Sequence, residues 1–171
     1  MKAHRFVLIT TLLILTFAVM NCGGRPIAYG VVLWAPQEAE LENGQLIEIM
    51  EESQLNNSYT VSTAEGGNTV TLPSWRVRRF ADQDDAMKYA NSYAPHADSF
   101  ARAERQALPV RQERDRLAPD VYRLREGELT KVLDRSDEPT NEAGFEGYWY
   151  KLLTKEGIEG WAFGYYLAVD G

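Results

Sequence analysis

Side chains that carry covalent and metal chemistry are scarce in this sequence. It holds one cysteine, Cys22, and two histidines, His4 and His96. A lone cysteine forms no internal disulfide, and these residues are too few for an ordinary zinc site. His96 stands beside no recognisable nucleophile motif, which argues against a Ser-His-Asp triad. We therefore expect no metal, no cofactor and no enzyme, although chemistry by carboxylates alone stays open among 25 acidic residues.

Basic residues are also in deficit. Eighteen Lys and Arg stand against 25 Asp and Glu, a formal net charge of −7. Without residues 1–21, which include Lys2 and Arg5, the chain has 16 basic residues and a net charge of −9. A chain this acidic is not an electrostatic binder of nucleic acid, and anionic lipid headgroups would repel it weakly.

One long apolar run is present near the N-terminus. Fifteen uncharged residues, Phe6 to Met20, follow Lys2 and Arg5. This pattern is typical of a secretory signal peptide, and the run is short for a spanning helix, although an uncleaved anchor is the alternative. Cys22 follows directly, and the segment resembles the lipidated N-terminus of bacterial lipoproteins. Asn21 departs from the small residue usual before that cysteine, so cleavage that leaves a free thiol is the other alternative.

That resemblance implies a protein of the bacterial cell envelope. We expect acyl chains, such as palmitate, on Cys22 to hold it at a membrane, facing the periplasm or the cell surface. The pattern does not distinguish the inner from the outer membrane.

Strand signals dominate the rest of the chain. Trp75-Arg76-Val77-Arg78 alternates apolar and charged residues as a half-buried strand does, and turn signals such as Glu65-Gly66-Gly67-Asn68 separate the strand-like runs. Leu108-Pro109-Val110-Arg111 is predicted to open a second β unit, and residues 134–146 to form a long loop.

Between the two β units the pattern is helical. Asp82 is a candidate N-cap, and an apolar stripe at helical spacing runs from Ala86 to Phe100 and Ala101. Pro95 interrupts the stripe, which predicts a kinked helix or two short helices.

Two aromatic-rich runs flank a Glu-Gly turn in residues 147–167, the pattern of a β-hairpin. The stretch resembles the end of a bacterial SH3 domain, where a Trp-Tyr-Lys strand, a tight turn and a Gly-Trp strand close a small barrel. The resemblance covers residues 107–169, is weaker over 29–80, and does not cover the helical part. A shift of 83 residues aligns Gly44 with Gly127, and a shift of 91 aligns Tyr59 with Tyr150, which predicts an internal duplication.

We therefore expect a mainly β chain with two small SH3-like barrels joined by a helical segment, kinked at Pro95. The predicted divisions are a signal peptide at 1–21, a tether at 22–28, a degenerate SH3-like domain at 29–80, a helical linker at 82–105 and a bacterial SH3-like domain at 107–171.

The aromatic side chains are the candidate binding residues. Alternation predicts that Trp149 and Lys151 share the face opposite Tyr150 and Leu152 and are partly exposed. The resemblance implies that Trp149 and Tyr166 lie in a ligand groove. The candidate ligand-binding residues are Trp149, Lys151, Tyr166 and Trp161. The alternative is that these rings only fill small cores.

Charged residues form two clusters. The acidic block comprises Glu38, Glu40, Glu42, Glu48, Glu51 and Glu52. The arginines are Arg102, Arg105, Arg111, Arg114, Arg116, Arg123 and Arg125. Such runs are usually solvated faces, and mutual pairing across a domain boundary is the alternative.

The resemblance implies a non-catalytic binding or scaffolding module, with cell-wall peptide or an envelope protein as its ligand. Phe163 stands where peptide-binding members have a proline, which argues against proline-rich ligands. Two alternatives remain open: an accessory subunit or carboxylate-based hydrolase of the envelope, and a purely structural envelope protein.

Overall fold

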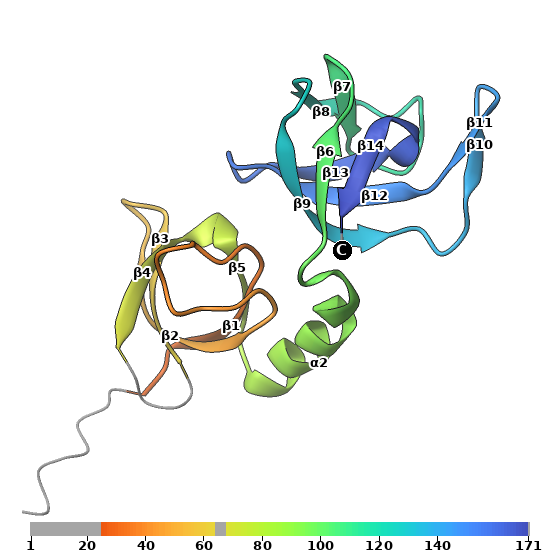
Figure 1. The fold of residues 1–171 in the computed structure, drawn as a ribbon. Helices are drawn as coiled ribbons and strands as arrows, with labels where there is room; N and C mark the ends of the chain where they lie inside the picture. Colours follow the sequence, from red (N-terminus) through yellow and green to blue (C-terminus); the bar gives the residue numbers. More distant parts are fainter. Residues whose placement is uncertain (1–24, 64–67, 171) are drawn as a thin grey trace, which may run out of the picture.

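The computed structural model describes residues 25–63 and 68–170. The predicted signal peptide and Cys22 lie outside these residues. Within them, no helix is long and apolar enough to cross a membrane. The described chain is mainly β, as predicted, with a single α-helix between two groups of strands (Figure 1).

The N-terminal unit is a five-stranded antiparallel sheet in the order β4-β3-β2-β1-β5. Its elements are β1 (Ala28–Val32), β2 (Leu46–Ser53), β3 (Ser58–Thr63), β4 (Thr69–Pro73), the 3-10 turn η1 (Ser74–Arg76) and β5 (Val77–Phe80). Aliphatic side chains on alternate strand positions, such as Val32, Ile47, Ile49 and Val61, are buried together and form the core of this unit.

Helix α2 (Gln83–Tyr93) follows the first sheet. Asp82 caps it as predicted, because the side chain of Asp82 accepts a hydrogen bond of 2.9 Å from the backbone N–H of Asp85. The helix gives way to the 3-10 turn η2 (Ala94–His96), which contains Pro95. The predicted interruption at Pro95 is confirmed, since α2 ends at Tyr93 and Pro95, which supplies no backbone N–H, lies in the 3-10 turn that follows.

The predicted helical linker over residues 82–105 is wrong at its C-terminal end. Residues Phe100–Ala103 form strand β6, in which Ala101 and Ala103 are buried while Arg102 is exposed. Small alanines at these positions fit a helical stripe and a strand face equally well. The sequence pattern therefore did not separate the two.

The C-terminal unit is a seven-stranded sheet in the order β14-β6-β9-β12-β13-β7-β8, with a separate hairpin of β10 and β11. Its other elements are β7 (Leu108–Arg111), β8 (Asp120–Leu124), β9 (Leu129–Arg135), β10 (Thr140–Glu142), β11 (Phe145–Gly147), β12 (Trp149–Leu153), β13 (Glu159–Phe163), the 3-10 turn η3 (Gly164–Tyr166) and β14 (Leu167–Asp170). The β10–β11 hairpin occupies part of the segment predicted as a long loop.

The two units share a strand order, as the duplication predicts. The run β14-β6-β9-β12-β13 has the same neighbours as β5-β1-β2-β3-β4. The hydrogen bonds agree: Gly44 N–H donates to Val32 O at 2.7 Å, and Gly127 N–H donates to Ala103 O at 2.8 Å. Both glycines have positive φ, 80° and 78°, which is a conformation that glycine adopts without steric cost.

This correspondence corrects the domain boundary. Strand β6 is the counterpart of β1, so the second unit begins at Phe100 and not at residue 107. Strands β7 and β8 are an added hairpin that pairs with the β13 edge. Within the described residues, the pairing ends at β4 and β5 in one sheet and at β14 and β8 in the other. Closure into two barrels therefore stays a prediction.

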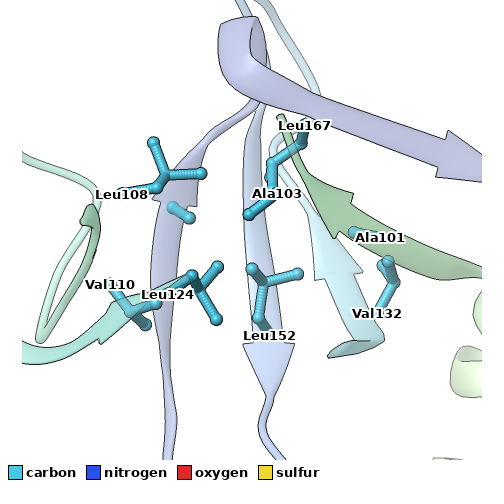
Figure 2. Close-up of a cluster of buried hydrophobic side chains, with 9 residues drawn as sticks. Ala101, Ala103, Leu108, Val110, Leu124, Val132, Leu152 and Leu167 are labelled. Atoms are coloured by element: carbon cyan, nitrogen blue, oxygen red, sulfur yellow. The ribbon is translucent and has the colours of Figure 1, made fainter. Parts of the chain in front are cut away.

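The core of the C-terminal unit combines both parts of its sheet. Figure 2 shows the side chains of Leu108, Val110 and Leu124 converging on those of Leu152 and others from the duplicated strands. Because β7 and β8 supply buried aliphatic residues to the core, the added hairpin is an integral part of the unit.

A third buried cluster joins the two units through α2. It contains Val31 and Leu33 from the N-terminal unit, Ala86, Tyr93 and Ala97 from the helical segment, and Leu133 and Leu153 from the C-terminal unit. The helical stripe therefore serves as a packing face over Ala86 to Tyr93, as predicted.

Lys131 in β9 is fully buried beside this cluster. Its Nζ donates hydrogen bonds to the carbonyl oxygens of His96 (3.1 Å), Ala97 (2.5 Å) and Ser99 (2.9 Å). All three ammonium N–H donors are thus satisfied by the chain that leads from η2 into β6. Burial lowers the pKa of Lys131 to about 8, with the charge of Asp98 opposing the change.

Candidate binding site

A hollow of about 320 Å³ opens beside the start of β12 in the C-terminal unit. Its walls come from β7, the β10–β11 hairpin, β12, β13 and η3. The apolar and aromatic lining residues are Leu108, Pro109, Ala143, Phe145, Trp149, Phe163 and Tyr166, and the charged ones are Arg105, Arg111, Arg116 and Glu142. We call this site the Trp149 hollow.

Trp149 lies in the wall of the hollow and is 2% exposed. The prediction that it is partly exposed is wrong. The ring packs on Phe163 and lies in a wall shared with β7 and the β10–β11 hairpin, and alternation along one strand does not account for such neighbouring segments. Ser136 holds its backbone: Trp149 N–H donates to Ser136 Oγ, and Ser136 N–H donates to Trp149 O. Within the described residues, the buried indole Nε1–H has no hydrogen-bond acceptor.

Aromatic rings form the exposed rim of the hollow. Phe145 is 40% exposed and packs on Tyr165, with ring centroids 4.3 Å apart, and Tyr165 meets Tyr166 edge-on at 4.8 Å. Deeper in, Trp149 packs on Phe163 at 5.5 Å. Such rings offer a large, rigid apolar surface at low cost in side-chain entropy.

Three arginines surround these rings, and they differ in how far they are already paired. Arg111 forms an ion pair of 2.9 Å with Asp120, and Arg116 approaches Glu142 at 3.9 Å. The guanidinium of Arg105 lies 4.4 Å from the ring centroid of Tyr166, and no carboxylate among the described residues pairs with it.

The structure separates the four predicted binding residues. Trp149 and Tyr166 line one hollow, as predicted. Lys151 faces a different hollow between the units, where it pairs with Glu159 at 3.3 Å, and Glu159 also pairs with Arg78 at 2.6 Å. Trp161 lies outside both hollows, beneath the guanidinium of Arg114 at 4.9 Å.

Trp149 and Lys151 thus line different hollows although both belong to β12. The pairing of β12 with β13 is regular, and the register shift in its pairing with β9 follows Lys151 and leaves Leu133 of β9 as the extra residue of a β-bulge. Tyr150 and Leu152 do pack on the same core, as alternation predicts.

The charge clusters do not pair with each other in the described part of the chain. Glu52 of the acidic block pairs with Arg79, while Arg111 and Arg123 both pair with Asp120. The same part of the chain holds no group of three His, Cys, Asp or Glu residues that could bind a metal ion.

Two comparisons with known proteins bear on the N-terminal unit and the whole chain. Residues 27–95 match the family model described as "TP0260 family, N-terminal SH3 domain". The chain carries an SH3-like domain. A protein of Treponema pallidum (strain Nichols) is 30% identical over 165 residues, which cover 95% of this chain and 36% of that relative. The chain thus spans about a third of the length of the relative.

The family model matches a different part of the chain from the one that carries the sequence resemblance, which covers residues 107–169. It covers the unit over which the resemblance is weaker, and it runs through β5 into α2, which the sequence analysis assigns to a linker. Packing of Ala86 and Tyr93 beside Val31 and Leu33 explains this extension, because the helix covers one face of β1.

The described part of the SH3-like domain lacks the aromatic site of the second unit. Ser58 opens β3 and pairs with Pro73, whereas Trp149 opens β12 and pairs with Phe163. Its corresponding hollow, of about 400 Å³, carries Glu38 and Arg76 as its charged residues. Burial lowers the pKa of Arg76, and the charge of Glu38 opposes that change.

The residues that the sequence analysis missed are Arg105, Phe145 and Phe163. Phe145 lies in a segment predicted as a long loop. An isolated aromatic residue in such a loop could have indicated a binding residue. Arg105 fell in the predicted helical linker, so its position beside η3 followed only once β6 was known.

Proposed function

We propose that this protein is a membrane-anchored lipoprotein of the bacterial cell envelope that binds an extended peptide, from the cell wall or from a partner protein, without catalysis. The anchor is proposed from Cys22, which directly follows the apolar run. The binding role is supported by the SH3-like domain, since such domains serve widely as interaction modules.

The observation that carries the proposal is the Trp149 hollow. A buried Trp149 with an unsatisfied indole donor stands beside an exposed Phe145 and a half-buried Tyr166. Large aromatic residues in a concave site are the usual anchors of a binding interface.

The test is selection of peptides by the full-length protein in detergent. A library of random dodecapeptides and a set of cell-wall muropeptides would be offered, and the affinity of each enriched peptide measured by fluorescence anisotropy. Phe145→Ala should weaken binding by about 1–2 kcal/mol, roughly tenfold, because it removes an exposed anchor.

The matched control is Leu55→Ala, which truncates a 93% exposed apolar side chain in the SH3-like domain. It should leave the affinity unchanged. Failure of the library and the muropeptides to bind, or equal effects of the two variants, would refute the proposed site.

A further inference from the structure

We propose that the Trp149 hollow selects an acidic protein segment: an extended chain with a carboxylate at the Arg105 end of the hollow and an apolar side chain against the rings. This inference rests on the proposed function and names the ligand class for the same site.

The lining of the hollow is basic, whereas the protein as a whole is acidic. The chain carries a net charge of −7, yet the lining of the hollow has three arginines and one carboxylate, Glu142. Oppositely charged surfaces steer a ligand into place and reject the wrong partner. A basic segment would be attracted by the rest of the surface and repelled here.

Arg105 is the arginine that remains available. Arg111 donates through Nη1 both to Asp120 and to the carbonyl oxygen of Ala118, and the ion pair with Asp120 neutralises its charge. Arg105 is held over the face of Tyr166, and no carboxylate among the described residues pairs with its guanidinium. A guanidinium fixed on a ring keeps its in-plane N–H groups free for a bidentate bond with a carboxylate.

The position of Arg105 is fixed by the backbone on both sides. Glu104 N–H donates to the carbonyl oxygen of Tyr166 at 3.0 Å, which ties the chain before Arg105 to η3. Ala107 then turns the chain with a φ of 57° into β7, where Leu108 is buried. The arginine is therefore presented from a constrained turn, which limits the entropy lost when it binds a ligand.

A second hollow beside Trp149 indicates which way the ligand runs. A second hollow of about 370 Å³ shares Trp149 and is lined by Arg114, Asp137 and Glu138 among others. Two carboxylates against one guanidinium disfavour an acidic side chain there. The acidic residue of the ligand consequently lies toward Arg105, and the part that passes Asp137 is neutral or basic.

The test compares six peptides, in which three residue pairs of different charge each stand on either side of a central Leu. Capped, fluorescein-labelled peptides would carry a central Leu next to Glu-Glu, Gln-Gln or Lys-Lys, with the pair placed on either side of Leu, and anisotropy would be measured on the full-length protein in detergent. The Glu peptide should bind about tenfold more tightly than the Gln peptide in one of the two orientations, as one charge-assisted bidentate bond implies. The preference should shrink in high salt.

Two arginine variants locate the effect. Arg105→Gln should reduce the preference for Glu over Gln to about twofold or less, since a neutral amide cannot form the charge-assisted pair. Arg125→Gln is the matched control, because Arg125 is exposed and lies outside the lining of both hollows. It should keep the full preference.

The outcomes separate this inference from the proposed function. Equal binding of the Glu and Gln peptides, preference for the Lys peptide, or equal effects of the two arginine variants would overturn the acidic ligand and leave peptide binding standing. Binding by none of the peptides, together with failure of the library selection, would overturn both. Sedimentation velocity would also show whether the protein self-associates. If it does, and Arg105→Gln abolishes the association, the occupant of the hollow is a second copy of this chain and the inference is overturned.

Discussion

Lys131 occupies a position that a lysine seldom takes, because its side chain is fully buried and satisfied by three backbone carbonyls. Lys131 lies in strand β9. Nothing in the local pattern predicts its burial, since the carbonyl acceptors come from residues more than thirty positions away. The burial of Trp149 is not predicted by alternation along β12, because the segments beside it belong to other elements.

Replacing Lys131 tests this arrangement. Lys131→Met should lower the free energy of unfolding by about 2 kcal/mol or more, because the carbonyls of His96, Ala97 and Ser99 lose their shared donor. Urea unfolding at pH 7 measures the change. A loss below about 0.5 kcal/mol would mean that the carbonyls find water instead.

The pH dependence of stability gives a second readout of the same residue. Burial lowers the pKa of Lys131 from 10.5 to about 8, so the unfolded chain binds its proton more tightly than the folded chain. The buried charge of Lys131 therefore destabilises the folded state. This destabilisation is fully present below pH 8 and is relieved as the pH rises toward 10.5. The wild type should therefore gain stability relative to Lys131→Met over that range. A constant difference between the two proteins would contradict the lowered pKa.

Among the elements, β6 is the strand that joins β9 to β14 in the second unit. It lies between β9 and β14, as β1 lies between β2 and β5. The sequence predicts β12 and β13, because two aromatic-rich runs flank a Glu-Gly turn there. It misses β6 because a short run with two alanines continues the helical stripe, and the strand order depends on long-range pairing.

Two fragments of the full chain distinguish the predicted boundary from the observed one. Residues 94–171 retain β6 and the carbonyls that hold Lys131, whereas residues 107–171 leave β9 and β14 without their shared neighbour. The longer fragment should give dispersed amide signals in a proton–nitrogen NMR spectrum, and the shorter one should not. Dispersed signals from residues 107–171 would show that β6 is dispensable.

For the whole molecule, the proposed anchor and the two β units lie in sequence along one chain, so attachment can be tested apart from binding. Cys22→Ser should abolish incorporation of a clickable fatty acid in cells, while Ser99→Ala, a buried hydroxyl far along the chain, should not. Stable membrane attachment needs more than one acyl chain, because a single chain binds reversibly. Equal labelling of Cys22→Ser and the wild type would refute lipidation at this residue.

The two units also meet directly, away from the helix. The turn at Gly157 packs on Trp75, and Arg78 pairs with Glu159 at 2.6 Å. The ion pair is partly exposed and contributes at most about 1 kcal/mol. The close contact of Gly157 is the more sensitive probe, because a methyl group there would lie 2.7 Å from Cβ of Trp75.

Gly157→Ala and Gly144→Ala form a matched pair for this contact. Both glycines have positive φ, 82° and 91°, so each substitution costs about 1 kcal/mol in the backbone. A Cβ at Gly144 meets no atom within 4 Å, whereas one at Gly157 is pressed against Trp75. Gly157→Ala should therefore destabilise the protein by about 1–3 kcal/mol more than Gly144→Ala in urea unfolding. Equal losses would mean that the units do not hold this contact in solution, and the buried cluster around α2 would then be the main connection between them.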